Sequence, residues 1–375
     1  AGERSRHPKS KSPWSTARRR SRRSRELSPS SSTLVGIDSI RRAAERIRPV
    51  ARRTPLLDAP FAPGSSAVEG GAGESTGRLW LKAESLQHVG AFKLRGAYNF
   101  LSSQDPSALT DGVITYSSGN HAQAVAWSAR EFGVQATVVM PTDAPATKRA
   151  ATIAYGARVE EAGTTTIERK ALAEAILAEE GGVMVPPFDH PEIIAGQGTV
   201  GLEIYEQLAE ERARRVEAQP EVGSLALVLV PIGGGGLIAG VSAAIRALSP
   251  GTRIIGVEPE GAAKMRGSLD AGFPITLDQV DTIADGLKPV RPGDLTFAHV
   301  REHVDDVVLV NDESIRRAVI WCYGQRLVVE PSGAATVAAL LSGRVSLAAG
   351  GATCAVLSGG NLDPTLLRTW LGEDS

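Results

Sequence analysis

The sequence predicts an α/β protein built on open, twisted parallel sheets with helices on both faces. Short apolar runs alternate with helical segments along most of the chain, which is the pattern of βαβ units. The 375 residues, of which 42% are hydrophobic, are enough for two domains. The longest apolar runs, such as 225–232, fall well short of the roughly 18 residues that a membrane-spanning helix needs. No membrane span is therefore expected.

The first helix is expected between residues 37 and 47, where apolar residues recur at spacings of three and four. Asp38 and Ser39 are its candidate caps, and Pro49 ends it. Further on, three strand–helix pairs are expected, at 113–116 with 121–132, 136–140 with 146–155, and 157–160 with 166–180.

A second series of elements is expected in the later half: helix 198–215, strand 225–230, helix 237–247 and strand 253–257. A strand at 78–82 follows a stretch rich in Gly and Ser at 63–77, which is expected to form a flexible surface loop. The chain is thus α/β almost throughout.

Residues 1–33 differ from the rest, with ten Lys and Arg against two Asp and Glu and almost no apolar residues. Such a segment cannot bury enough surface to offset chain entropy, so a disordered tail is expected. It is open to three interpretations: an organelle transit peptide, a nucleic-acid-binding arm, or an extension that the fold does not need. The third is favoured, because the tail lacks the leucines of an amphipathic targeting helix.

Residues 34–375 carry 31 basic and 40 acidic residues, a net charge of about −9. This part of the chain is therefore not expected to bind nucleic acid. Cys322 and Cys354 have no second Cys or His at metal-ligand spacing, which argues against a zinc site and a disulfide framework. A reducing compartment, the cytoplasm, fits best.

The densest glycine run follows a predicted strand and precedes an apolar helix; its members are Gly233, Gly234, Gly235 and Gly236. Consecutive residues without Cβ let backbone N–H groups turn toward one point, and the helix N-terminus adds its positive dipole end. A phosphate would be bound there. The run is neither a dinucleotide-binding GxGxxG motif nor a Walker A motif, so an oxidoreductase has only a glycine count in its favour.

Lys93 is the candidate for covalent chemistry. Phe92 precedes it, Leu94 follows it, and Gly90 lies shortly before. Apolar neighbours place a lysine in a partly desolvated pocket, where its amine can be neutral and can attack a carbonyl carbon.

A third group of candidate residues lies at a predicted strand-to-helix junction: Ser117, Ser118, Gly119, Asn120 and His121. Ligands of open α/β sheets lie at strand ends of this kind. Hydroxyls, amides and a side-chain donor there suit a carboxylate or a phenolate. The segment alone is equally explained as a helix cap.

Eight short motifs taken together resemble the fold type II pyridoxal phosphate (PLP) enzymes, whose fold is that of the tryptophan synthase β chain. The motifs are GAFKLRGA (90–97), SSGNHAQA (117–124), IAGQGTVGLEI (194–204), GGGGL (233–237), LSGGN (357–361), RTPL (53–56), TIADGL (282–287) and EPSGA (330–334). The resemblance extends over about residues 34–370 and is strongest to threonine/serine dehydratases and serine racemase.

The resemblance implies a role for each motif. Lys93 forms the Schiff base with PLP, and Phe92 lies against the cofactor ring. The run 233–236, with Leu237 opening the helix, binds the cofactor phosphate. Asn120 donates to the phenolic oxygen, and Ser358 lies beside the pyridine nitrogen, where a serine leaves that nitrogen neutral and favours prompt loss of a β-substituent.

The implied reaction is dehydration and deamination of a small hydroxy amino acid, L-threonine or L-serine, to 2-oxobutanoate or pyruvate and ammonium. The freed amine of Lys93 removes the Cα proton, and the turn 117–121 holds the substrate carboxylate. The alternative is serine racemase, in which Ser118 acts as a second base on the ring face opposite Lys93. Preference among threonine, serine and 3-hydroxyaspartate stays open.

The resemblance also carries expectations for metal, domains and assembly. Racemase-like relatives bind a divalent metal through a Glu, a backbone carbonyl and an Asp; Glu258 and Ala262 match the first two, but Lys264 replaces the Asp, which counts against a metal. The implied large domain combines 34–106 with 190–375, and the small domain is 107–189, with the cofactor between them. A homodimer is implied by the family.

Overall fold

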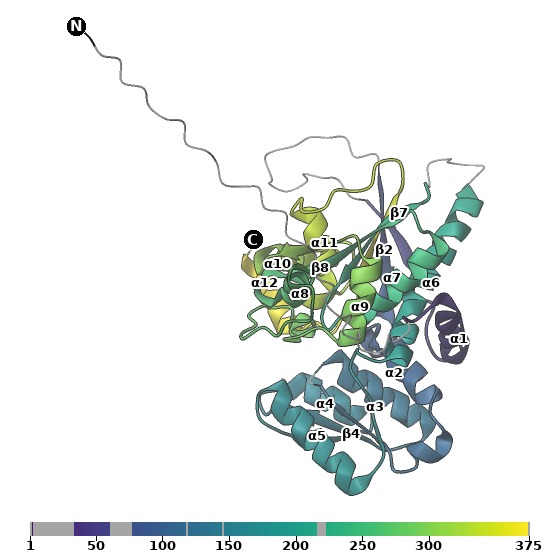
Figure 1. Ribbon diagram of the computed structural model, residues 1–375, viewed down its shortest axis with the longest axis vertical. Coiled ribbons are helices and arrows are strands. Elements are labelled where there is room, and N and C mark those ends of the chain that lie inside the picture. The colour runs from purple at the N-terminus through teal and green to yellow at the C-terminus, as the bar shows by residue number, and fades with distance from the viewer. Residues whose placement is uncertain are drawn as a thin grey trace. The chain divides into compact units, whose positions relative to one another are not determined.

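Two open sheets organise the chain in the computed structural model (Figure 1). The structure describes residues 2, 34–60, 77–117, 119–144, 146–215 and 223–373. The predicted disordered tail (1–33, apart from Gly2) and the predicted loop, except its last residue, lie outside the described residues, as does Ser118. Both sheets belong to the second unit of the chain, 34–375.

The larger sheet has the strand order β1-β2-β10-β7-β8-β9, in which every pairing is parallel except that of the edge strand β1 with β2. The predicted fold class is thus correct, with one antiparallel edge strand that the sequence analysis did not predict. The strands are β1 (Leu56–Ala59), β2 (Arg78–Ala83), β7 (Leu225–Pro231), β8 (Arg253–Pro259), β9 (Asp306–Val310) and β10 (Ala352–Leu357).

The smaller sheet is parallel throughout, in the order β5-β4-β3-β6. Its strands are β3 (Val113–Tyr116), β4 (Ala136–Met140), β5 (Arg158–Glu161) and β6 (Val183–Met184). The predicted small domain, 107–189, encloses these four strands, and the two-domain division itself stays a proposal.

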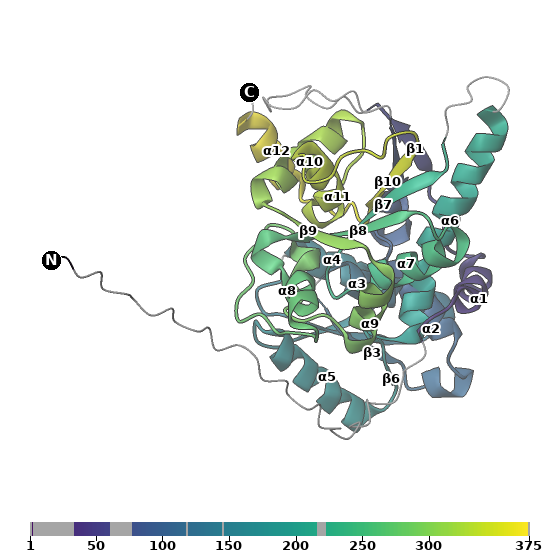
Figure 2. The ribbon, with the colours of Figure 1, turned by 45° about the horizontal axis from the view of Figure 1, so that its top comes forward.

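Helices cover both faces of each sheet (Figures 1 and 2). They are α1 (Ile37–Ile47), α2 (Lys93–Ser102), α3 (Asn120–Phe132), α4 (Ala146–Ala154), α5 (Thr166–Glu180), α6 (Pro191–Arg215), α7 (Gly236–Leu248), α8 (Lys264–Ala271), α9 (Asp294–His303), α10 (Asp312–Gly324), α11 (Pro331–Leu341) and α12 (Pro364–Glu373).

The central strand β7 shows why its sequence is apolar at every position. Leu227 and Leu229 pack with α10 and α11 on one face, whereas Val228 and Val230 pack with α6, α7 and α9 on the other. Successive side chains of a strand point to opposite faces, so a sheet covered on both sides needs a continuous apolar run. In the smaller sheet, α2 and α3 cover one face and α5 the other.

Most predicted element bounds agree with the structure within two residues, and two expectations need correction. The N-cap of α1 is Gly36, so Asp38 and Ser39 both lie inside the first turn and neither is the N-cap. Helix α6 begins at Pro191, not at 198. Gly196 and Gly198 lie inside this helix, at close approaches to the α2 backbone and to Ile40, where a Cβ would have no room.

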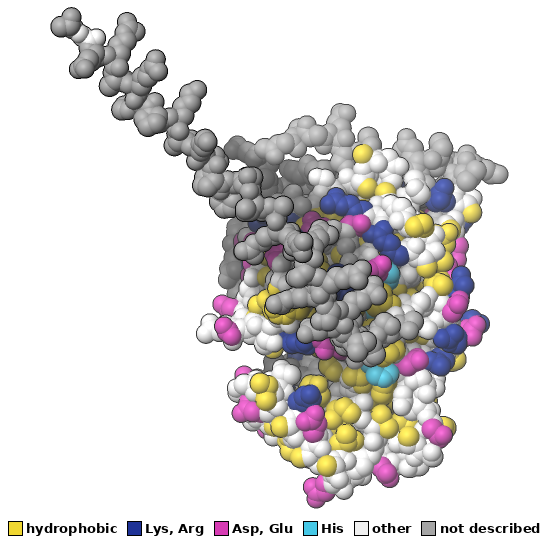
Figure 3. Space-filling view, viewed as in Figure 1, with side chains coloured by type: hydrophobic (Ala, Val, Ile, Leu, Met, Phe, Trp, Pro, Cys, Tyr) yellow, Lys and Arg dark blue, Asp and Glu magenta, His cyan; other side chains and the backbone are white. Residues whose placement is uncertain are grey.

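The described surface mixes charges of both signs. On the face shown in Figure 3, Lys and Arg side chains are interspersed with Asp and Glu. Among the described residues, no helix is long and apolar enough to cross a membrane.

Candidate active site

The candidate site residues lie where parallel strands end. The glycine loop (233–236) follows β7, Ser358 follows β10, and the segment leading to Lys93 follows β2. These three strands are neighbours in one parallel sheet, so their carboxyl ends share an edge. The turn 117–121 follows β3 of the smaller sheet. Ligands of open α/β sheets bind at such edges.

Lys93 is the first residue of α2 and is partly buried. Its Nζ donates a hydrogen bond to the carbonyl oxygen of Pro187, at 2.7 Å, and lies 5.4 Å from the centre of the Phe92 ring. Desolvation lowers the pKa of Lys93 to about 8, because burial penalises the charged ammonium. An amine with this pKa is available in its neutral, nucleophilic form near physiological pH.

The segment 185–190 joins Lys93 to the glycine loop and was not predicted as part of the site. Its Pro187 accepts from Lys93, its Phe188 ring packs against Gly234, and its Asp189 carboxylate accepts three backbone N–H bonds at the start of α9. The available signal was position, since this segment ends shortly before the IAGQGT motif that begins at residue 194.

The glycine loop leads into α7. Gly235 is the N-cap, with a φ of +98° that disfavours any residue with a Cβ. The Thr296 hydroxyl of α9 donates to the carbonyl oxygen of Gly234 at 2.7 Å, and this bond holds the loop against α9. The first N–H groups of a helix have no intrahelical acceptor, so the loop and Leu237 offer donors and a positive dipole end to an anion.

Phe92 and Ser358 are joined through the backbone. The N–H of Phe92 donates to the carbonyl oxygen of Ser358 at 3.1 Å, and Ala91 forms a bridge with Gly359. This contact sets the start of α2, and therefore Lys93, against the end of β10. Ser358 itself is buried.

Asn120 opens α3 and lies in a chain of side-chain hydrogen bonds. Its Nδ2 donates to Oε1 of Glu330 at 2.6 Å, and its Oδ1 accepts from Nδ2 of Asn361 at 2.8 Å. Asn361 also donates to the carbonyl of Val89 at 2.8 Å. Glu330 belongs to the EPSGA motif and Asn361 to the LSGGN motif, but no role was predicted for either side chain. Burial raises the pKa of Glu330, while the Asn120 bond and the Lys148 charge oppose that rise.

His121 is buried and lies close enough to Lys93 for their charges to interact. Its Nε2 lies 3.3 Å from the carbonyl oxygen of Val185. Burial, and secondly the Lys93 charge, lower the pKa of His121 to about 3, so its ring is neutral at physiological pH. Its side chain faces the 185–190 segment.

A buried ionic network lies behind Lys93 on the same helix. Arg95 forms ion pairs with Glu84, at 2.8 Å, and with Glu203, at 2.6 Å, and both Arg95 and Glu84 are fully buried. These bonds tie α2 to the segment after β2 and to α6. They hold the helix that carries Lys93 in a fixed orientation.

Comparison with known proteins matches the family described as "Pyridoxal-phosphate dependent enzyme" over residues 47–359. The chain belongs to this family. It is 43% identical over 325 residues to an L-threonine ammonia-lyase of Geobacter sulfurreducens, covering 86% of this chain and 75% of the relative. It is 39% identical over 322 residues to an L-threo-3-hydroxyaspartate ammonia-lyase of Saccharomyces cerevisiae, covering 86% and 91% of the two chains.

A solved structure of maize serine racemase superposes with a TM-score of 0.79 at 36% identity, covering 91% of this chain and 98% of that one. The predicted family, fold class and cofactor are thereby confirmed. The roles of the individual site residues stay proposals.

The residues of this PLP-dependent enzyme fit the cofactor that its family implies. Lys93, whose pKa is lowered, is connected through the segment 185–190 to a glycine loop at a helix N-terminus. That pairing offers an amine for the aldehyde and a cradle for the phosphate. Asn120 and Ser358 would hold the oxygen and nitrogen of the ring, with Phe92 against its face.

The residues that matched a metal site do not fit one. The ammonium of Lys264 lies 3.0 Å from both Glu258 Oε1 and the carbonyl oxygen of Ala262. The Lys264 side chain thus contacts the same two oxygen atoms, of Glu258 and Ala262, that a metal ion would need as ligands. Among the described residues, no group of three or more His, Cys, Asp or Glu side chains could hold a metal ion.

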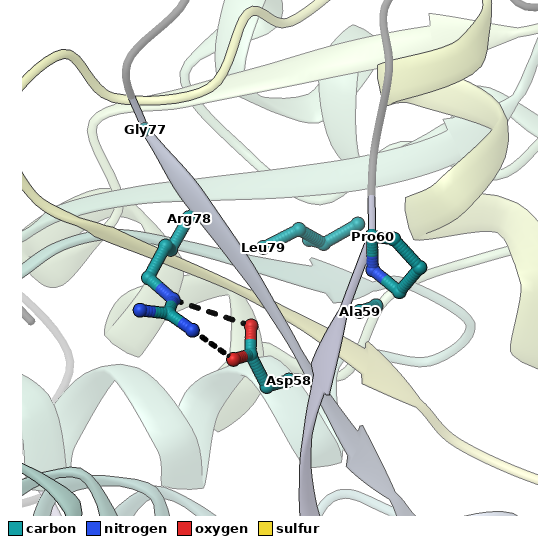
Figure 4. A pocket seen from close by; sticks show the side chains of 6 residues that line it. All are labelled: Asp58, Ala59, Pro60, Gly77, Arg78 and Leu79. Atoms are coloured by element: carbon teal, nitrogen blue, oxygen red, sulfur yellow. Dashed lines mark hydrogen bonds and ion pairs between the residues drawn. The ribbon is translucent and has the colours of Figure 1, made fainter.

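A surface pocket of about 390 Å³ lies away from these residues, at the ends of β1 and β2 (Figure 4). It contains the ion pair between Arg78 and Asp58. No predicted site residue lines this pocket.

Proposed function

We propose that this PLP-dependent enzyme is a threonine/serine ammonia-lyase, which converts L-threonine or L-serine to 2-oxobutanoate or pyruvate and ammonium. The observation that carries the proposal is Lys93: a desolvated amine that the segment 185–190 connects to the glycine loop, in a chain with a threonine ammonia-lyase relative at 43% identity. The yeast relative also bears the name of an ammonia-lyase. Both names support elimination from a hydroxy amino acid.

The protein's own groups divide the work. PLP, when bound, accepts the negative charge that develops at the substrate's Cα. Lys93 serves as the base that removes the Cα proton, since a pKa of about 8 allows proton exchange near neutral pH. The backbone N–H groups of the turn 117–121 bind the substrate carboxylate. Asn120, held by Glu330 and Asn361, is fixed in position before ligands arrive.

Serine racemase is the second candidate, favoured by the similarity to the maize enzyme. It requires a second base opposite Lys93, and Ser118 is the proposed group. Ser118 lies outside the described residues, so this proposal rests on its place in the sequence.

The test incubates the purified enzyme, supplied with PLP, separately with L-threonine, L-serine, D-serine and L-threo-3-hydroxyaspartate. The 2-oxo acid released and the enantiomer composition are measured in the same samples. We expect 2-oxo acid from L-threonine or L-serine, and a loss of at least about 1,000-fold in Lys93→Ala. Lys170→Ala, an exposed lysine paired with Glu174, is the matched control and retains activity.

Two results would contradict the lyase proposal. Enantiomer interconversion faster than 2-oxo acid release, and lost in Ser118→Ala, would establish the racemase. Absence of both products from an enzyme whose absorbance spectrum shows bound PLP would contradict both candidates.

We further propose a homodimer in a reducing, cytoplasmic compartment. Cys322 and Cys354 are buried free thiols, and burial raises the pKa of each to about 12, which suits an environment without disulfides.

The proposed dimer interface includes Tyr323 and Val328, at the end of α10 and just beyond it, which are large exposed apolar side chains. Sedimentation velocity tests the dimer: a single species at the monomer mass would contradict it.

A further inference from the structure

Lys264 is a fully buried lysine whose ammonium lies in a cage of oxygen atoms. Its Nζ donates to three main-chain carbonyls, those of Ile232, Ala262 and Leu287, each at 3.0 Å. The carboxylate of Glu258, also fully buried, lies 3.0 Å away. Three N–H donors thus meet three carbonyl acceptors, and the single positive charge meets a single negative one.

The cage favours the protonated amine. A neutral amine has two N–H groups and a lone pair, which would face one of the carbonyl oxygens. Burial lowers the pKa of Lys264, and the Glu258 charge opposes that effect. Glu258 is itself held in place, because its two oxygens accept from the backbone N–H groups of Met265 and Arg266 at 3.0 and 2.9 Å.

The three carbonyls come from three segments that meet at the glycine loop. Ile232 immediately precedes the loop, Ala262 lies in the turn after β8, and Leu287 ends the short helix Asp285–Leu287. Gly233 packs against the carbonyl group of Gly286, the residue before Leu287. A Cβ added at Gly233 would lie 2.8 Å from that carbonyl oxygen. One ammonium therefore connects the start of the phosphate-binding loop to two further segments.

We propose that Lys264 is a built-in cation that holds the glycine loop in its PLP-binding conformation, so that cofactor binding needs no dissociable divalent metal. Lys264 is a positioning residue, because it acts on the cofactor through the loop. The inference rests on the proposed phosphate-binding role of the loop and not on the identity of the substrate. It is therefore tested by cofactor affinity, and a failure of the lyase proposal would leave the result unchanged.

The test compares the wild-type chain with Lys264→Met, which keeps a long side chain without the charge, and with Lys264→Asp, which supplies an oxygen ligand in place of the ammonium. For each, the affinity for PLP and the melting temperature of the apoenzyme are measured in EDTA and in Mn²⁺. The wild-type affinity should be the same in both. Lys264→Met should bind PLP roughly 10- to 100-fold more weakly in both, since charge-assisted bonds are lost.

Lys264→Asp should regain PLP affinity and melting temperature when Mn²⁺ is added, because the introduced carboxylate would join Glu258 and the carbonyls as an oxygen ligand. Arg246→Met is the matched control: Arg246 donates to three carbonyls, those of His303, Pro250 and Thr252, and pairs with Asp305, at the opposite end of α7 from the loop. It should lower the melting temperature and leave PLP affinity unchanged.

Either of two results would overturn the proposal, even if the Lys264→Asp variant does not fold. One is a wild-type PLP affinity that falls in EDTA and returns with Mn²⁺. The other is a Lys264→Met variant with wild-type affinity for PLP.

Discussion

The ammonium of Lys93 donates a hydrogen bond to the carbonyl oxygen of Pro187, with 2.7 Å between nitrogen and oxygen. The acceptor belongs to the segment whose Phe188 packs on the glycine loop. The amine proposed to react with the aldehyde and the loop proposed to hold the phosphate are thus positioned relative to one another by a single short segment of chain. Before PLP binds, the protonated amine is held by Pro187, and reaction requires it to lose a proton and leave that carbonyl.

The rate of PLP capture by the apoenzyme should therefore depend on pH. The pKa of Lys93, lowered to about 8, means that the reactive neutral amine increases as pH rises through 8. We expect the capture rate to rise about tenfold for each pH unit below 8 and to level off above it. Stopped-flow absorbance of PLP binding across this pH range measures the change, and a midpoint near 10.5, the ordinary lysine value, would contradict it.

Gly234→Ala should weaken PLP binding by about tenfold or more, because the added Cβ would clash with the nearest carbons of the Phe188 ring. Phe188→Ala in the same chain should recover part of the affinity by making room, which a double-mutant cycle detects. PLP affinity by fluorescence titration is the measurement. Gly251→Ala, where a Cβ would meet nothing within 4 Å, is the control, and two additive losses would rule out the contact.

The strands and the fold class could be predicted from the sequence because their signals are local. A strand such as Leu225–Pro231 is apolar at every position since both of its faces are covered, and Thr166–Glu180 begins with a capping box of Thr165 and Glu168. Lys93 and the glycine loop could also be found, because each lies within a distinctive run of sequence.

The remainder of the site could not be predicted, because it depends on contacts between distant residues. The bond from Lys93 to Pro187 joins positions 94 residues apart, and that from Asn120 to Glu330 joins positions 210 apart. Lys264 could be recognised as a departure from the metal-binding pattern. Its cage of three carbonyls is formed by the backbone, which leaves no trace in residue type.

Glu84→Gln should lower the free energy of unfolding of the apoenzyme by about 3–5 kcal/mol, because it removes one partner of a fully buried ion pair and leaves the Arg95 charge undercompensated. Urea unfolding followed by circular dichroism measures the change. Glu180→Gln, in the exposed pair with Arg158, should cost less than about 1 kcal/mol. Equal effects of the two variants would show that Arg95 does not depend on Glu84.

The stability of the Glu330→Gln apoenzyme, relative to that of the wild type, should increase as pH rises from about 4.5 toward neutrality. Burial raises the pKa of Glu330 in the folded chain above the ordinary 4.5, so over that range the unfolded chain has released the proton that the folded chain retains. Wild-type stability contributed by this group then falls with rising pH. Glutamine has no proton to release, and it still offers an oxygen to Nδ2 of Asn120.

The difference in melting temperature between Glu330→Gln and the wild type should thus increase across this range, while that of the exposed Glu180→Gln should not. A difference that is constant with pH would mean that Glu330 has the same pKa in the folded and unfolded chains. In that case the bond from Asn120 and the charge of Lys148 would offset the burial of the carboxylate.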